Sequence, residues 1–220
     1  MCFSARADIV AGLVVTTIGV DALRQVHRRQ ERALGAIPVV LGAHLLVEAV
    51  VWQGLTGDVA ASTGRLAMWA YLAVALLVVP VLVPLAVRAV EPDPGRRRVM
   101  GRLVAVGAGV AIVYLVVMVH GPVDVRIDGR HLAYRLGGTG YGGLLAAMYA
   151  VVGCAPPMLS SERRIAQFGL ANLMAVVALT WLQSSALTSL WCAWAAIASI
   201  AIAAHLRRAH RGAEVRMHPA

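Results

Sequence analysis

The sequence predicts an all-α membrane protein: a bundle of seven transmembrane helices with a small external β-hairpin between the fourth and fifth. Two observations predict this fold class. The 220 residues are 60% hydrophobic, with a mean hydropathy of +0.74, whereas a soluble domain is closer to half apolar. The apolar residues also gather in runs of about 20, the length of helix that crosses a hydrocarbon core of about 30 Å.

The apolar runs define the expected order of the helices. They cover residues 7–24, 33–55, 66–88, 99–119, 141–159, 164–183 and 186–206. Turn-rich or charge-rich segments separate them. We expect one transmembrane domain over 1–206 and a short basic cytoplasmic tail at 207–220. The first run has no features of a cleaved signal peptide, so it should remain as a helix.

The arginine residues predict the orientation. The net charge is +9, but the basic residues lie in the connections between the runs and do not form a nucleic-acid-binding surface. Fifteen of the twenty lie in every second connection and in the tail. Because cytoplasmic loops carry an excess of basic residues, the N-terminus should lie outside and the C-terminus in the cytoplasm. The expected partner is therefore the lipid bilayer and not a nucleic acid.

The one sizeable connection, 121–138, predicts a β-hairpin. Two segments of alternating apolar and polar residues flank Asp128-Gly129, a pair that favours the type I′ turn of a tight hairpin. We expect the hairpin to lie on the bundle. The residues expected to face the helix ends or the membrane are Val125, Ile127, Leu132 and Tyr134.

Prolines and glycines modify several helices. Pro80 and Pro84 lie one turn apart in the third run, where each removes a backbone donor and should bend the helix. Glycines in the first and fourth runs, including Gly12, Gly19 and Gly107, let neighbouring helices approach closely in lipid. We expect these residues to serve packing.

Two ionisable residues, His44 and Glu48, interrupt the apolar run 33–55. His44 is at its midpoint, and Glu48 is about 6 Å nearer the outer face. Steps of four residues advance only about 40° around a helix, so His44, Glu48 and Trp52 form one stripe. A charge near the bilayer centre costs at least about 2.5–3.5 kcal/mol. The stripe should therefore face the bundle interior, with Glu48 paired or protonated.

Other polar and aromatic residues are expected in the outer half of the bundle, among them Asp8 in the first turn of the first helix. The predicted ligand-binding residues are His44, Glu48, Trp52, Asn172, Trp191 and Trp194. The predicted ligands of a metal ion are Cys2, His44, Glu48 and Cys192. Cys2 is open to three interpretations: a free thiol, a modified residue, or the disulfide partner of Cys192. No residue is assigned a catalytic role.

Several functions remain open from the residues alone. The stripe can be a packing device, a site for a small ligand, metal ion or cofactor, or part of a proton-coupled transporter that uses Glu48. A membrane sensor or assembly subunit that docks a partner through arginine-rich loops is a further alternative. The leading hypothesis is a binding protein or membrane enzyme with a polar pocket at this stripe, because ionisable residues inside a membrane are functional by default. A transporter ranks lower, because no second copy of the Pro80–Pro84 pair is found.

Three segments resemble an uncharacterised family of bacterial seven-helix membrane proteins, whose members open with Met-Cys-Phe-Ser-Ala. The segments are MCFSA at 1–5, HLLVEAVVW at 44–52 and SLWCAWAA at 189–196. The resemblance covers most of the chain and implies a place in the bacterial cytoplasmic membrane. It implies motif positions at Cys2, Ser4, His44, Glu48, Trp52, Trp191 and Cys192. The family has no established activity, so the resemblance adds weight to the site and implies no mechanism.

Overall fold

A computed structural model describes residues 4–26, 28–129, 131–137, 142–182, 197–204 and 207. Most of them are helical. The helices are α1 (Ala5–Arg24), α2 (Arg32–Thr56), α3 (Ala61–Ala73), α4 (Val79–Val90), α5 (Pro94–His120), α6 (Gly142–Met158) and α7 (Arg163–Leu182). A short 3-10 helix, Arg29–Glu31, precedes α2, and a π-helical segment, Val74–Val78, joins α3 to α4. Residues 197–204 are helical as well.

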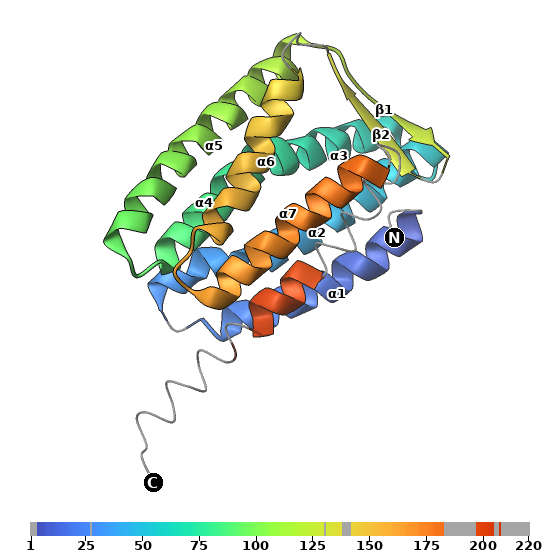
Figure 1. Cartoon of the computed structure of the whole chain (residues 1–220). Helices are drawn as coiled ribbons and strands as arrows, with labels where there is room; N and C mark the ends of the chain where they lie inside the picture. The colour runs from blue at the N-terminus through green and yellow to red at the C-terminus, as the bar shows by residue number, and fades with distance from the viewer. Residues whose placement is uncertain are drawn as a thin grey trace.

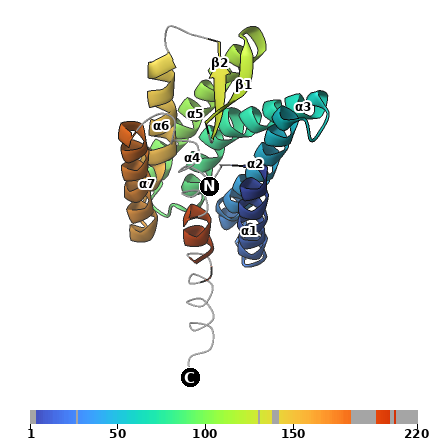
Figure 2. The same ribbon diagram turned by 90° about the vertical axis from the view of Figure 1, so that its right-hand side faces the viewer.

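The helices form one bundle, and the hairpin extends over one end of it (Figure 1). Figure 2 shows α1 and α2 on one side of the bundle and α6 and α7 on the other, with α4 and α5 between them. The helical segment 197–204 packs near α1, where Ile202 and Ala203 share an apolar core with Ala22 and Leu34.

Helices occupy the predicted apolar runs, and most of their ends lie within two residues of those expected, but the helices of the third and fourth runs begin five residues earlier, at Ala61 and Pro94. Only 197–204 of the seventh run belongs to the described part of the chain. Three stretches are long and apolar enough to cross a membrane: Arg29–Thr56, Ala61–Val90 and Pro94–His120. The mostly helical fold with one hairpin is therefore confirmed, whereas the crossing of a membrane by seven helices remains a prediction.

Close approach at glycines holds α1 against α2. A Cβ atom on Gly19 would lie 2.6 Å from the backbone nitrogen of Val39, and one on Gly42 would lie 2.5 Å from the backbone nitrogen of Thr16. Real Cβ atoms do not approach other atoms so closely, so only glycine allows this spacing. Small residues have the expected packing role here.

The long stretch Ala61–Val90 is interrupted at its middle. The π-helical segment Val74–Val78 lies just before Pro80, which has no N–H to donate. The carbonyl of Ala75 accepts a hydrogen bond of 2.7 Å from the hydroxyl of Tyr149 on α6. Helix α6 therefore supports an interruption that lies just before the first of the two prolines.

The predicted hairpin is present, with its turn one residue later than expected. β1 (Val123–Asp128) pairs antiparallel with β2 (His131–Leu136), and Asp128 lies opposite His131. Asp128 is therefore part of the paired strand and not of the turn, whereas the sequence predicted Asp128-Gly129 as the turn. Gly129 has a φ of 61°, a left-handed conformation that suits a tight turn.

One face of the hairpin packs against the bundle. Leu132 is buried, and Val125 and Tyr134 pack against the same core as Trp52. Three of the four residues expected on this face therefore contact the bundle. Ile127, the fourth, is 42% exposed near the turn.

Candidate ligand site in the bundle

The register between α1 and α2 decides which polar side chains meet. The two helices are antiparallel, and Gly12 faces Leu46. One turn nearer its N-terminus, α1 brings Asp8 to the level of Glu48 and Trp52 on α2. The carboxyl of Asp8 is close enough to interact with both side chains. Two carboxyls from adjacent helices therefore share one part of the interior.

Local capping contributes to this placement. The Oγ atom of Ser4 accepts a hydrogen bond of 3.3 Å from the backbone N–H of Ala7, and so begins α1. Asp8 follows in the next turn. Ser4 therefore helps to position the acid by starting the helix.

The stripe on α2 faces the interior, as expected. Asp8 and Glu48 are 0% exposed, His44 is 8% exposed, and Trp52 is also buried. Neither carboxyl points outward from the bundle or toward water at its rim. A carboxyl that faced lipid or water could not form an interior binding site, and the burial of Asp8 and Glu48 excludes that orientation.

Aromatic rings from three elements cover the cluster. The His44 ring stacks on the Tyr71 ring of α3, with centroids 3.9 Å apart and an interplanar angle of 16°. Tyr71 in turn stacks on Tyr134 of β2, with centroids 4.6 Å apart and an angle of 8°. The hairpin is therefore joined through Tyr71 to the imidazole at the centre of the stripe.

The cluster retains unused hydrogen-bonding capacity. Tyr71 donates a hydrogen bond to the carboxyl of Glu48. The carboxyl of Asp8 interacts with the indole N–H of Trp52 but completes no hydrogen bond of good geometry with it, and Nδ1 of His44 is buried and completes none to a described residue. Buried polar groups normally have partners, and an unmet one costs about 1–3 kcal/mol. A molecule bound among these side chains would supply the missing partners.

The chemistry of the cluster favours a cation or a proton. Asp8 and Glu48 are close enough to repel each other when both are charged. Such a pair is stable when it shares a proton or holds a positive charge between its members. The described residues contain no group of three or more His, Cys, Asp or Glu side chains spaced to hold a metal ion. The predicted ligands Cys2 and Cys192 lie outside the described residues, so the predicted metal set stays a prediction.

The other predicted ligand-binding residues are not in this cluster as described. Trp191 and Trp194 lie outside the described residues. Asn172 on α7 donates a hydrogen bond of 3.3 Å to the Sγ atom of Cys154 and lines a different cavity. The structure therefore brings together His44, Glu48 and Trp52.

A cavity of about 530 Å³ lies beside the cluster, between the adjacent ends of α2 and α3 and strand β1. Val51 and Met68 line it and also belong to the core that contains Trp52 and Tyr71. Asp124 of the hairpin lines its other side. The cavity adjoins the core that contains Trp52 and Tyr71, but none of the cluster's own side chains lines it.

Comparison with known proteins places the chain in a family. A family model described as "Family of unknown function (DUF6629)" matches residues 1–217. The chain belongs to this family. The predicted resemblance to an uncharacterised family is therefore confirmed. No curated protein and no solved structure matches the chain.

Sequence reasoning did not assign Asp8, Tyr71 and Tyr134 to the site. Asp8 has a signal in the sequence, because it is an acid in the first turn of an apolar helix that contains glycines. The pairing of glycines between the first two helices could have set its level against Glu48. The stack of Tyr71 and Tyr134 depends on how the hairpin packs against the bundle, and no sequence pattern indicates this packing.

Proposed function

We propose that this protein is an integral membrane protein of the bacterial cytoplasmic membrane that binds a small cation, either a metal ion or an organic cation. The N-terminus lies outside and the C-terminus in the cytoplasm. The binding site is in the outer half of the bundle, where Asp8 and Glu48 supply negative charge and His44 supplies a ring nitrogen. The observation that carries the proposal is the meeting of two fully buried carboxyls from adjacent helices.

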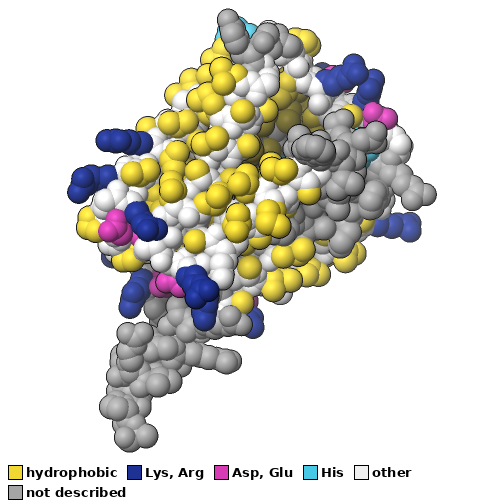
Figure 3. All heavy atoms as spheres, in the orientation of Figure 1, with side chains coloured by type: hydrophobic (Ala, Val, Ile, Leu, Met, Phe, Trp, Pro, Cys, Tyr) yellow, Lys and Arg dark blue, Asp and Glu magenta, His cyan; other side chains and the backbone are white. Residues whose placement is uncertain are grey.

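The surface of the bundle supports a membrane setting. Hydrophobic side chains cover the middle of the face in Figure 3, and arginine side chains gather toward its ends. On α5, Ile112, Val116 and Val119 are each more than half exposed. Soluble monomers rarely expose continuous apolar surface of this kind, whereas lipid covers it at no cost.

The hairpin gives the site a cover. Tyr134 stacks on Tyr71, which stacks on His44. In this proposal the three rings lie between the carboxyls and the outer solution. Exclusion of water strengthens the attraction between a cation and two carboxylates. An approach through the adjacent cavity beside Asp124 would bring the ligand to the core that contains Trp52 and Tyr71.

Analysis of the purified full-length chain tests the proposal. Elemental analysis and mass spectrometry of released small molecules should find one cation in near-stoichiometric amount. Asp8→Asn and Glu48→Gln should each reduce that amount at least tenfold, since each removes one of the two charges that hold it.

Asp21→Asn is the matched control, because it makes the same change at the other end of α1, where Asp21 pairs with Arg207. This variant should retain the cation. Absence of any bound cation from the wild-type chain, or equal retention by the Asp8 and Asp21 variants, would contradict the proposal.

A second candidate is a proton-coupled transporter of small solutes that uses Glu48. The observation that favours it is the interrupted stretch Ala61–Val90, whose π-helical segment follows closely after Tyr71. Interrupted helices beside an intramembrane carboxyl are common in transporters. Here Asp8 and Glu48 would share a proton, and the segment Val74–Val78 would change shape as the proton moves.

Proteoliposomes distinguish the two candidates. A transporter acidifies or alkalinises the vesicle interior when solute is added, and Glu48→Gln abolishes this change. A binding protein retains its cation under the same conditions and moves no protons.

A further inference from the structure

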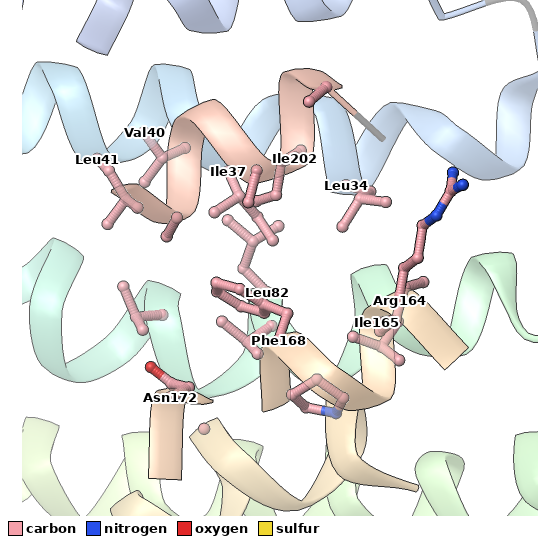
Figure 4. A pocket seen from close by; sticks show the side chains of 18 of the residues that line it. Leu34, Ile37, Val40, Leu41, Leu82, Arg164, Ile165, Phe168, Asn172 and Ile202 are labelled. Atoms are coloured by element: carbon pink, nitrogen blue, oxygen red, sulfur yellow. The ribbon is translucent and has the colours of Figure 1, made fainter. Parts of the chain in front are cut away.

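A second cavity, of about 350 Å³, lies between α2, α4, α6, α7 and the helical segment 197–204. Apolar side chains form most of its walls, among them Leu82, Phe168 and Ile202 (Figure 4). Its volume is within the range of about 300–1,000 Å³ typical of sites for small molecules. No residue of the polar cluster lines it, so it is a separate site.

Two polar side chains lie toward opposite ends of this cavity. Figure 4 shows Arg164 at the end where Leu34 lies, with its guanidinium extending beyond the apolar walls, and Asn172 toward the end where Leu41 lies. Leu34 and Leu41 are seven residues apart on α2, roughly 10 Å. Arg164 is exposed and belongs to neither of the ion pairs found among the described residues.

We propose that this cavity binds one acyl chain of an anionic phospholipid, with the lipid phosphate held by Arg164. An apolar cavity does not hold ordered water and is suited to hydrocarbon. A guanidinium matches a phosphate through paired N–H donors. The elongated apolar space with a cation at one end therefore matches both parts of such a lipid.

The depth of Arg164 agrees with this ligand. The arginine lies near the start of α2 and of α7, the ends that the arginine distribution assigns to the cytoplasmic side. Anionic lipids give the cytoplasmic leaflet its negative surface potential. The inference shares this membrane setting with the proposed cation site but depends on none of its residues.

Gly153 on α6 shows that the cavity has room. It lines the cavity, and a Cβ atom built on it would meet no atom within 4 Å. A larger side chain at this position therefore enters the space proposed for the acyl chain without meeting the backbone of a neighbouring helix.

Native mass spectrometry of the full-length protein tests the proposal. Protein stripped of lipid by extensive detergent washing is offered phosphatidylglycerol or phosphatidylcholine with identical acyl chains. One phosphatidylglycerol should remain bound per chain, with about a fivefold preference over phosphatidylcholine, as expected for one arginine near an anionic group.

Two variants separate the acyl chain from the phosphate. Gly153→Leu fills the cavity and should reduce retention of both lipids at least tenfold, whereas Gly109→Leu, at an exposed glycine of α5 with open space around it, should not. Arg164→Gln should abolish the preference for phosphatidylglycerol and leave binding of phosphatidylcholine unchanged. Arg163→Gln, at the adjacent exposed residue outside the cavity, is its control.

Several results would overturn the proposal. Wild-type protein could be found to retain neither lipid, or to retain both lipids equally. The Arg164 and Arg163 variants could also show the same lipid preference. Asp8→Asn should leave lipid binding unchanged, so a failure of the cation site is distinguishable from a failure of this one.

Discussion

At the scale of single residues, the largest unfavourable contributions come from Asp8 and Glu48. Each carboxyl is fully buried, and each repels the other when both are charged. Burial of a charge without compensation disfavours the folded state. Residues of this kind persist where a function needs them, and removal of the charge then improves stability at the expense of that function.

Asp8→Asn should raise the melting temperature of the cation-free protein. The amide has nearly the same shape as the carboxyl and removes the cost of burying a charge. We expect a gain of about 0.5–2 kcal/mol in the free energy of unfolding, measured by thermal unfolding in detergent. Asp21→Asn should give no gain. A lower melting temperature for Asp8→Asn than for the wild type would assign this carboxyl a packing role instead.

Glu91 shows how a buried carboxyl is held when its role is structural. It is 2% exposed and accepts hydrogen bonds of 2.9 Å from Ser160 Oγ and from the backbone N–H of Ser161, whose hydroxyl also donates to it. These bonds join the α4–α5 connection to the α6–α7 connection. Burial alone would raise the pKa of Glu91, but the hydrogen bonds outweigh it and hold the pKa below its ordinary value of 4.5.

Glu91→Gln should therefore destabilise the protein in a pH-dependent way. Because the folded state lowers the pKa, the stabilisation is complete above about pH 4.5 and is lost as the pH falls through the folded pKa. At pH 7 the variant should be about 1–3 kcal/mol less stable. The difference in melting temperature from wild type should shrink in acid. A difference that is constant with pH would contradict this role.

At the scale of elements, the sequence predicts the helices well because hydropathy alone defines them. Each described helix lies on an apolar run, and the hairpin follows from alternating residues around Gly129. The π-helical segment Val74–Val78 was not predictable, because it depends on contacts with other helices. Tyr149 of α6 binds its Ala75 carbonyl, and α5 packs against Pro80. Asp128 pairs within the strand and lies outside the turn because of a strand pairing that local propensity does not determine.

The contact between α4 and α5 makes a matched pair of glycine substitutions informative. A Cβ atom on Gly107 would lie 2.0 Å from the carbonyl oxygen of Pro80, whereas one on Gly109 would meet nothing within 4 Å. Gly107→Ala should cost at least about 1–3 kcal/mol through overpacking. Gly109→Ala should be neutral or stabilise by about 0.5–1 kcal/mol, because alanine favours helix. Equal melting temperatures for the two variants would contradict this packing.

At the scale of the whole molecule, the site was predictable only in part. The cost of a charge in an apolar helix predicts that His44, Glu48 and Trp52 face inward, and the structure confirms it. Asp8 and Tyr71 join these residues because of which helices are neighbours and because of the register in which those helices pack. One apolar helix gives no information about either. Tyr134 belongs to a strand that is distant along the chain from Tyr71, so their stacking contact is known only from the folded structure.

The predicted orientation is a property of the whole chain and can be measured in intact cells. Arg126→Cys, exposed on the hairpin, should react with a membrane-impermeant thiol reagent added outside. Arg97→Cys, exposed at the start of α5, should react only after the cells are permeabilised. Labelling is counted above that of the parent chain, which has three cysteines. The reverse pattern would contradict the orientation derived from the arginines.

The central claim is that two buried carboxyls, Asp8 and Glu48, hold a positive charge between them. Infrared difference spectroscopy of the full-length protein, before and after removal of bound cations, measures the state of these carboxyls most directly. The account predicts that carboxylate bands give way to the band of a protonated carboxyl, and that Asp8→Asn and Glu48→Gln abolish this change. A wild-type spectrum that cation removal does not alter, or a change that persists in both variants, would contradict it.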